Sequence, residues 1–348
     1  MWKKIITGVL VICVIVAIWQ RELLSYGWMQ AKGQLKILWN TQPVEKVLAN
    51  PAYPDSLKRK IELIQEIKRF AIDSIGLNPS GSYTTYYEQH GQPILWVITA
   101  SEPYRLVAHQ WSFPFLGTFS YKGFFEKPRA EKEEAELKKE GLDTRIGEVS
   151  AWSTLGFFND PILSSMLERP VGRLAELIIH ELTHGTLFIK NSLEYNENLA
   201  DFVGEYGALR FMAQKYGKES TTYKAYLAER TYDERYDEHI LRGTQTLDSL
   251  YRTFGSQTPV AEKQRLKTAM IEQIVETVDT LTDGQPKLLQ PLTKKRKKHR
   301  LKLPNNAYFV GYLTYRKQQN RFRAEFEERF NGDFKRYFSY LKETYPSL

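Results

Sequence analysis

The sequence predicts a mostly helical α+β protein with one small sheet. Runs rich in β-branched and aromatic residues are concentrated between residues 83 and 155, and such runs are typical of strands. From residue 197 onward, apolar residues recur mainly at helical spacing. Between these regions lies His-Glu-Leu-Thr-His at residues 180–184. We therefore expect a small sheet, then helices that carry this motif, then a helical C-terminal part.

The first 22 residues predict a membrane anchor. Lys3 and Lys4 precede an apolar run from Ile5 to Trp19, as in a signal sequence. The run is shorter than the ~20 residues of a typical membrane span, but no small-residue cleavage site follows it. We expect an uncleaved signal anchor with residues 23–348 on the extracytoplasmic, periplasmic side. A cleaved signal and a buried helix of a soluble protein are the alternatives.

The body begins with helices. Residues 23–48 have a helical pattern that Pro43 interrupts, and residues 55–74 form one apolar helical face. A turn cluster at residues 78–82 separates them from the predicted sheet at about 83–155. The expected strands are residues 94–100, 104–108, 117–121 and 144–150, with a charged helix at 130–141.

The histidines of the central motif lie four residues apart. Apolar residues recur at helical spacing around them, and residues four apart share one face of a helix. His180 and His184 can therefore offer two imidazoles to one Zn²⁺, and Glu181 can reach a water on the metal. Gly185 follows immediately, so the helix should end or bend there. We expect the metal-site helices to span about residues 170–215.

A catalytic zinc needs a third protein ligand. Twelve residues after His184 comes Glu197, on a second predicted helix for which Asn196 is a possible N-cap. Asp201 lies one turn further on the same face, where it can accept the N–H of a ligand histidine. The three-histidine pattern is excluded, because Lys190 stands where a third histidine would follow.

The cysteine content and the distribution of charge limit which other sites and partners the chain can have. The only cysteine is Cys13, so the body has neither an internal disulfide nor a cysteine zinc site. The net charge of +8 includes a basic run from Lys294 to Arg300. This run lies in a predicted loop at 282–304 of the helical part 216–348. It is either a solvated loop or a contact for anionic lipid headgroups, and the anchor argues against nucleic-acid binding.

Asn-Glu-x-x-Ala-Asp after His-Glu-x-x-His resembles the gluzincin signature of thermolysin-like peptidases, with a shorter gap. A closer resemblance is to the bacterial family named putative aminopeptidase. It rests on residues 151–161, on Gly33-Gln34-Leu35 and on Asn305-Asn306-Ala307. The resemblance implies a zincin-like (thermolysin-like) core. It also implies that Glu148 to Ser153 pair with extended substrate and that Tyr315 or Tyr312 stabilises the oxyanion.

The predicted function is a zinc-dependent peptidase, with aminopeptidase activity implied by the family. The alternatives are a membrane-anchored zinc endopeptidase of envelope proteins and a non-catalytic zinc-containing scaffold. Glu181 argues against the scaffold, because a site without turnover needs no general base. Peptides or proteins are the expected substrates.

Overall fold

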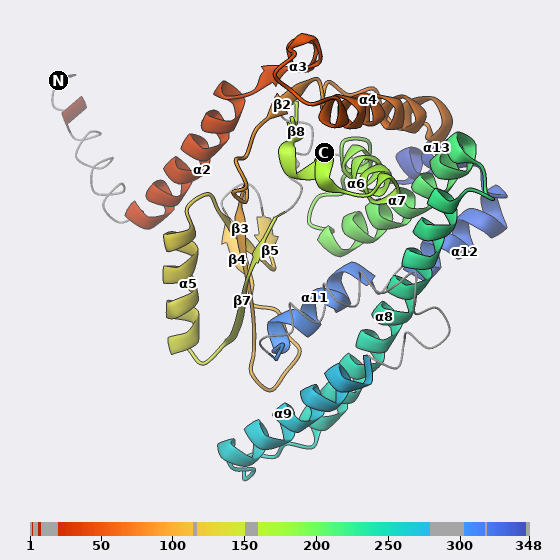
Figure 1. The fold of residues 1–348 in the computed structure, drawn as a ribbon. Coiled ribbons are helices and arrows are strands. Elements are labelled where there is room, and N and C mark those ends of the chain that lie inside the picture. The colour runs from red at the N-terminus through yellow and green to blue at the C-terminus, as the bar shows by residue number, and fades with distance from the viewer. Residues whose placement is uncertain are drawn as a thin grey trace.

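The structure is a computed structural model that describes residues 20–113, 117–149, 159–278, 303–316 and 319–345, with residues 2, 6 and 7. For residues 314–316, 319 and 320 it describes the backbone alone. The fold is mostly helical α+β, as predicted, and the described strands form three small sheets (Figure 1).

The N-terminal part is helical. Helix α2 (Arg21–Trp39) is followed by strand β1 (Gln42–Pro43), helix α3 (Val44–Ala49) and helix α4 (Asp55–Phe70), which continues as a π-helical turn (Ala71–Ile75). In the described part of the chain, no helix is long and apolar enough to cross a membrane. The predicted anchor at residues 1–22 lies largely outside the described residues.

The main sheet is antiparallel. Strand β3 (Trp96–Ser101) pairs with β6 (Lys122–Phe124) on one side and with β7 (Asp143–Glu148) on the other. Helices α2 and α5 (Lys127–Lys139) share its apolar cluster. The strand expected at residues 104–108 is wrong. Backbone bonds from Glu102 to Val107 and from His109 to Ala100 fold this segment back as a loop.

Two smaller sheets accompany it. Strands β1, β2 (Thr85–Tyr87) and β8 (Ile162–Leu163) form one, and β4 (Trp111–Phe113) and β5 (Gly117–Phe119) form the other. A 3₁₀ turn (Ser164–Glu168) leads from β8 into the central helices.

The central helices are α6 (Val171–His184) and α7 (Leu193–Tyr216), which pack against each other in opposite directions. With α4, α12 (Gln319–Phe330) and α13 (Phe334–Thr344) they enclose the largest apolar core. Helices α8 (Thr221–Arg252) and α9 (Val260–Glu276) extend away from this body as a pair (Figure 1). Helix α11 (Asn306–Arg316) lies between them and the sheet.

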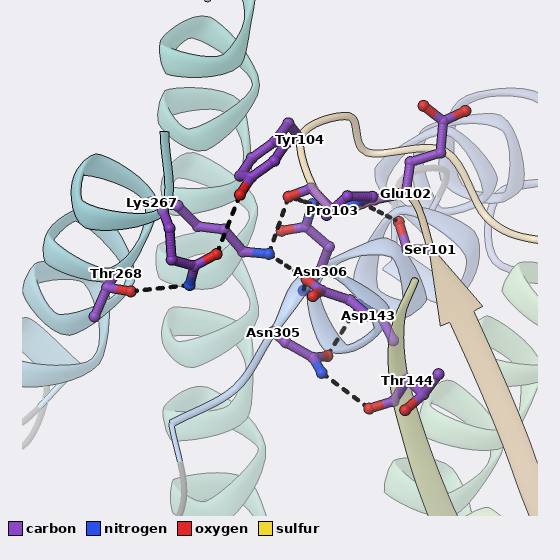
Figure 2. A network of polar contacts seen from close by, with 12 residues as sticks. Ser101, Glu102, Pro103, Tyr104, Asp143, Thr144, Lys267, Thr268, Asn305 and Asn306 are labelled. Atoms are coloured by element: carbon purple, nitrogen blue, oxygen red, sulfur yellow. Dashed lines mark hydrogen bonds and ion pairs between the residues drawn. The ribbon is translucent and has the colours of Figure 1, made fainter. Parts of the chain in front are cut away.

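A buried polar network fixes α11 to the sheet (Figure 2). Lys267 of α9, 3% exposed, forms an ion pair with Asp143 and donates to the Pro103 carbonyl at 2.9 Å. The Asn306 backbone N–H donates to Asp143 at 2.9 Å, and the Asn306 amide donates to the Glu102 carbonyl at 2.8 Å. Buried polar groups require such partners. Asn305 and Asn306 of the Asn-Asn-Ala motif at residues 305–307 therefore join α11 to the first two residues of β7.

Candidate metal centre

Helix α6 presents both histidines at its C-terminal end. Leu174, Ile178 and Leu182 recur every four residues and are buried in the core, which turns the opposite face toward the site. The helix ends at His184, as predicted from Gly185. His180 and His184 are one turn apart, and their Nε2 atoms lie 3.1 Å from each other.

The turn into α7 is held by an asparagine. Helix α7 begins at Leu193, so the prediction of Asn196 as its N-cap is wrong. Instead the buried Asn196 amide accepts from the Ile189 N–H at 2.9 Å and donates to the Ile189 carbonyl at 2.8 Å. The side chain satisfies both backbone groups of a loop residue, which sets where α7 starts relative to α6.

Glu197 faces the two histidines from α7. Its carboxylate oxygens lie 3.7 Å from the His180 Nε2 and 3.7 Å from the His184 Nε2. Ligands at the zinc distances of 2.0–2.2 Å and tetrahedral angles lie about 3.4 Å apart. The three side chains offer two imidazole nitrogens and one carboxylate oxygen within 4.8 Å of one another. This donor set and spacing fit a zinc ion with an open fourth position.

Asp201 contacts the outer nitrogen of one candidate ligand, His180. The His180 Nδ1 lies 2.9 Å from the Asp201 Oδ1. A neutral His180 that donates Nδ1–H to this carboxylate keeps its Nε2 lone pair toward the cluster. Burial lowers the pKa of His180, but the Asp201 bond and the nearby acids outweigh it and raise the pKa to about 10.

Burial shifts the pKa values of the other two candidate ligands in opposite directions. Burial raises the pKa of Glu197 to about 7, although His180 opposes the shift. Burial and the neighbouring His180 lower the pKa of His184 to about 3. Each shift favours the neutral form of a group removed from water. A cation that displaced the protons of His180 and Glu197 would make both side chains available as metal ligands.

Gly204 lets α6 and α7, which carry the candidate ligands, approach closely. A Cβ atom at Gly204 would lie 2.8 Å from the Glu176 carbonyl oxygen and 3.2 Å from the His180 Cβ. The first distance is shorter than real Cβ contacts, and its partner is rigid helix backbone. Glycine at this position therefore sets the spacing between His180 on α6 and the acids on α7.

Glu181 and two tyrosines lie near the candidate metal site. Glu181 is half-buried beside His180. Burial raises the pKa of Tyr83, and Glu181 adds to the shift. Burial also raises the pKa of Tyr121, with further contributions from Glu197 and Glu181. Both phenols therefore remain protonated hydrogen-bond donors near these acids. No motif marks either one among 21 tyrosines.

The predicted oxyanion tyrosines lie on α11. The Tyr312 hydroxyl accepts from Tyr308 at 3.3 Å, and the Tyr308 hydroxyl lies 2.8 Å from that of Tyr236. These three rings line a cavity of about 580 Å³ between β7, α8, α9 and α11, to which no metal-site residue contributes. Tyr315 is in the last turn of α11, and its side chain lies outside the described residues. The basic run at 294–300 and most of the run at 151–161 also lie outside them.

A family model described as Putative aminopeptidase matches residues 25–345. No curated protein and no solved structure gives a significant match.

Proposed function

Because the chain belongs to the putative aminopeptidase family, we propose that it is a zinc-dependent peptidase whose ligands are His180, His184 and Glu197. The convergence of their donor atoms, with Asp201 at the outer nitrogen of His180, is the observation that carries the proposal. The same residues support a gluzincin site on a zincin-like core.

Zinc, when bound, would acidify a water molecule and polarise a substrate carbonyl. Glu181 follows His180 directly on α6, so its carboxylate is adjacent to the site. We assign two steps to Glu181. It takes a proton from the attacking water and then delivers that proton to the leaving amine nitrogen. Asp201 holds the His180 ring, and Gly204 holds α7 against α6. Tyr315 remains the proposed oxyanion donor, whereas Tyr312 lines the 580 Å³ cavity, to which no residue of the candidate metal site contributes.

The outer edge of β7 supports a peptide as substrate. β7 is an edge strand, and the Val149 N–H bonds inward to the Leu95 carbonyl. Backbone groups alternate along an antiparallel strand, so those of Ile146 and Glu148 point outward. Among the described strands, none pairs with this edge. The 580 Å³ cavity adjoins its first half, and a second cavity of about 670 Å³ adjoins its end. An extended peptide adds to such an edge through main-chain bonds.

The location remains part of the proposal. The apolar run from Ile5 to Trp19, with Lys3 and Lys4 before it, supports an anchor that holds the body on the extracytoplasmic face. The run from Lys294 to Arg300 would add contact with anionic headgroups.

The test is digestion of a peptide library by the full chain purified in detergent. Each peptide is supplied with a free and with an acetylated N-terminus, and Glu181→Gln is compared with wild type and with Glu272→Gln, at an exposed acid of α9 that lines neither cavity. Cleavage of free peptides alone establishes an aminopeptidase, and cleavage of both sets establishes an endopeptidase. A zinc-loaded wild type that cleaves neither set would contradict the proposal and favour a scaffold.

A further inference from the structure

Helix α2 exposes a stripe of large apolar side chains. Trp39 is 78% exposed, Trp28 70%, Leu24 55% and Leu35 39%. These positions are separated by four, seven and four residues, so they share one face. At 1.5 Å per residue the stripe is about 22 Å long. An exposed apolar patch of this kind marks an interaction surface.

The opposite face of α2 is fixed to the body. Met29 and Ile37 are buried, and the Tyr26 hydroxyl and the Gln30 amide both donate to the Gly123 carbonyl, at 2.9 and 2.7 Å. At Gly33 a Cβ would lie 2.2 Å from the Phe125 ring, so the helix sits tightly against this segment. Figure 1 shows α2 on the outer side of the body beside α5. The helix therefore cannot roll to hide its stripe.

Charge along α2 favours an anionic surface. Arg21, Lys32 and Lys36 are all exposed, and Glu22 is the single acid of the helix. Basic residues beside a face of tryptophan and leucine are typical of helices that lie in the membrane interface. Tryptophan prefers the headgroup level, where its ring is partly apolar and its N–H is hydrated.

The chain connection favours the bilayer as the partner. The apolar run of the sequence ends at Trp19, and α2 begins at Arg21. Two residues span at most about 7 Å. If the run is in a bilayer, the first turn of α2 must lie at its surface. A second copy of the chain would not account for this proximity.

We propose that α2 lies flat in the membrane interface, with Leu24, Trp28, Leu35 and Trp39 at the boundary between headgroups and acyl chains. Since α2 is bonded to the sheet, the contact fixes the orientation of the whole body on the membrane. The inference rests on the proposed membrane anchor and does not depend on the metal site.

The test is nitroxide depth measurement on the full chain in phosphatidylethanolamine–phosphatidylglycerol vesicles. Single labels are placed by Trp28→Cys and Trp39→Cys in a Cys13→Ser background. Val260→Cys on α9, at a residue 70% exposed, is the matched control. Labels at 28 and 39 should lie about 5–10 Å below the headgroup surface. They should collide severalfold more with oxygen than with a water-soluble nickel complex, and the label at 260 should show the reverse.

Two outcomes would overturn the proposal. One is water exposure at positions 28 and 39 equal to that at 260. The other is dipolar broadening at 28 and 39 without lipid contact, which would identify a second copy on the stripe. Hydroxyl-radical footprinting of the unsubstituted chain in the same vesicles removes any dependence on folding of the variants. Trp28 and Trp39 should be oxidised severalfold less than their exposure implies, and full oxidation of both would reject the interfacial position.

Discussion

Replacing Gly204 by alanine would insert a methyl group where α6 and α7 come closest beside His180. The new Cβ would lie 2.8 Å from the Glu176 carbonyl oxygen, whereas ordinary contacts begin near 3.4 Å. The helices must therefore separate by about half an ångström, because packed backbone cannot yield locally. Alanine favours a helix by about 1 kcal/mol over glycine, but overpacking costs about 1–3 kcal/mol. The net result should be a modest loss of stability.

The larger effect should be on the metal. Separation of α6 from α7 moves His180 away from Glu197 and Asp201, whose contacts with it are 3.7 and 2.9 Å long. Loss of a supporting contact typically lowers metal affinity by about 10- to 100-fold. We expect about a tenfold loss of zinc affinity for Gly204→Ala, equivalent to about 1.4 kcal/mol.

Zinc affinity is measured by competition with a chromophoric chelator at fixed pH, and stability by denaturant unfolding of the zinc-free protein. The control is Gly185→Ala, directly after His184, where the nearest atom to a new Cβ is 3.6 Å away. Gly185→Ala should bind zinc as wild type does. Zinc affinity of Gly204→Ala within twofold of wild type would refute the spacing role of Gly204.

Four further results are expected. Glu181→Gln should retain zinc and fold but lose at least ~10²-fold in turnover, and normal turnover by this variant would reject Glu181 as the base. Asp201→Ala should bind zinc about 10- to 100-fold more weakly, and unchanged affinity in a metal titration would make Asp201 a surface acid. His180 loses its proton when zinc binds, and its pKa is raised to about 10. Protons therefore compete less as pH rises, and apparent zinc affinity should increase about tenfold per pH unit from about 7 to 9; a flat profile would contradict this. Tyr315→Phe should cost ~10² to 10³ in turnover while Tyr312→Phe is nearly silent, and equal kinetics for the two would remove that assignment.

Local sequence patterns predicted the helices that carry the candidate ligands well. The end of α6 at His184 follows from the glycine at position 185, and the one-turn spacing of the histidines follows from helix geometry. Spacing along the second helix predicted that Asp201 contacts one of the two motif histidines, and in the structure it contacts His180. These features depend on residues close together in the chain, so periodicity and breakers specify them.

Features set by distant partners were not predicted. Gly204 stands inside α7, and glycine is needed there because the Glu176 backbone of α6 comes close. Asparagine is a common N-cap residue, but the Asn196 amide forms hydrogen bonds with the Ile189 backbone instead. Strands of two or three residues, such as β1 and β8, carry too little pattern to be divided among sheets in advance.

Elemental analysis of the full chain, purified in zinc-containing buffer without chelator, tests the metal assignment most directly. Wild type is compared with His184→Ala and Glu197→Ala, and with Glu168→Ala as a control outside the site. We predict one zinc per chain in wild type and in the control, and loss of zinc in both ligand variants. A zinc-free wild type, or stoichiometric zinc in His184→Ala, would contradict the assignment of His180, His184 and Glu197 as a zinc site.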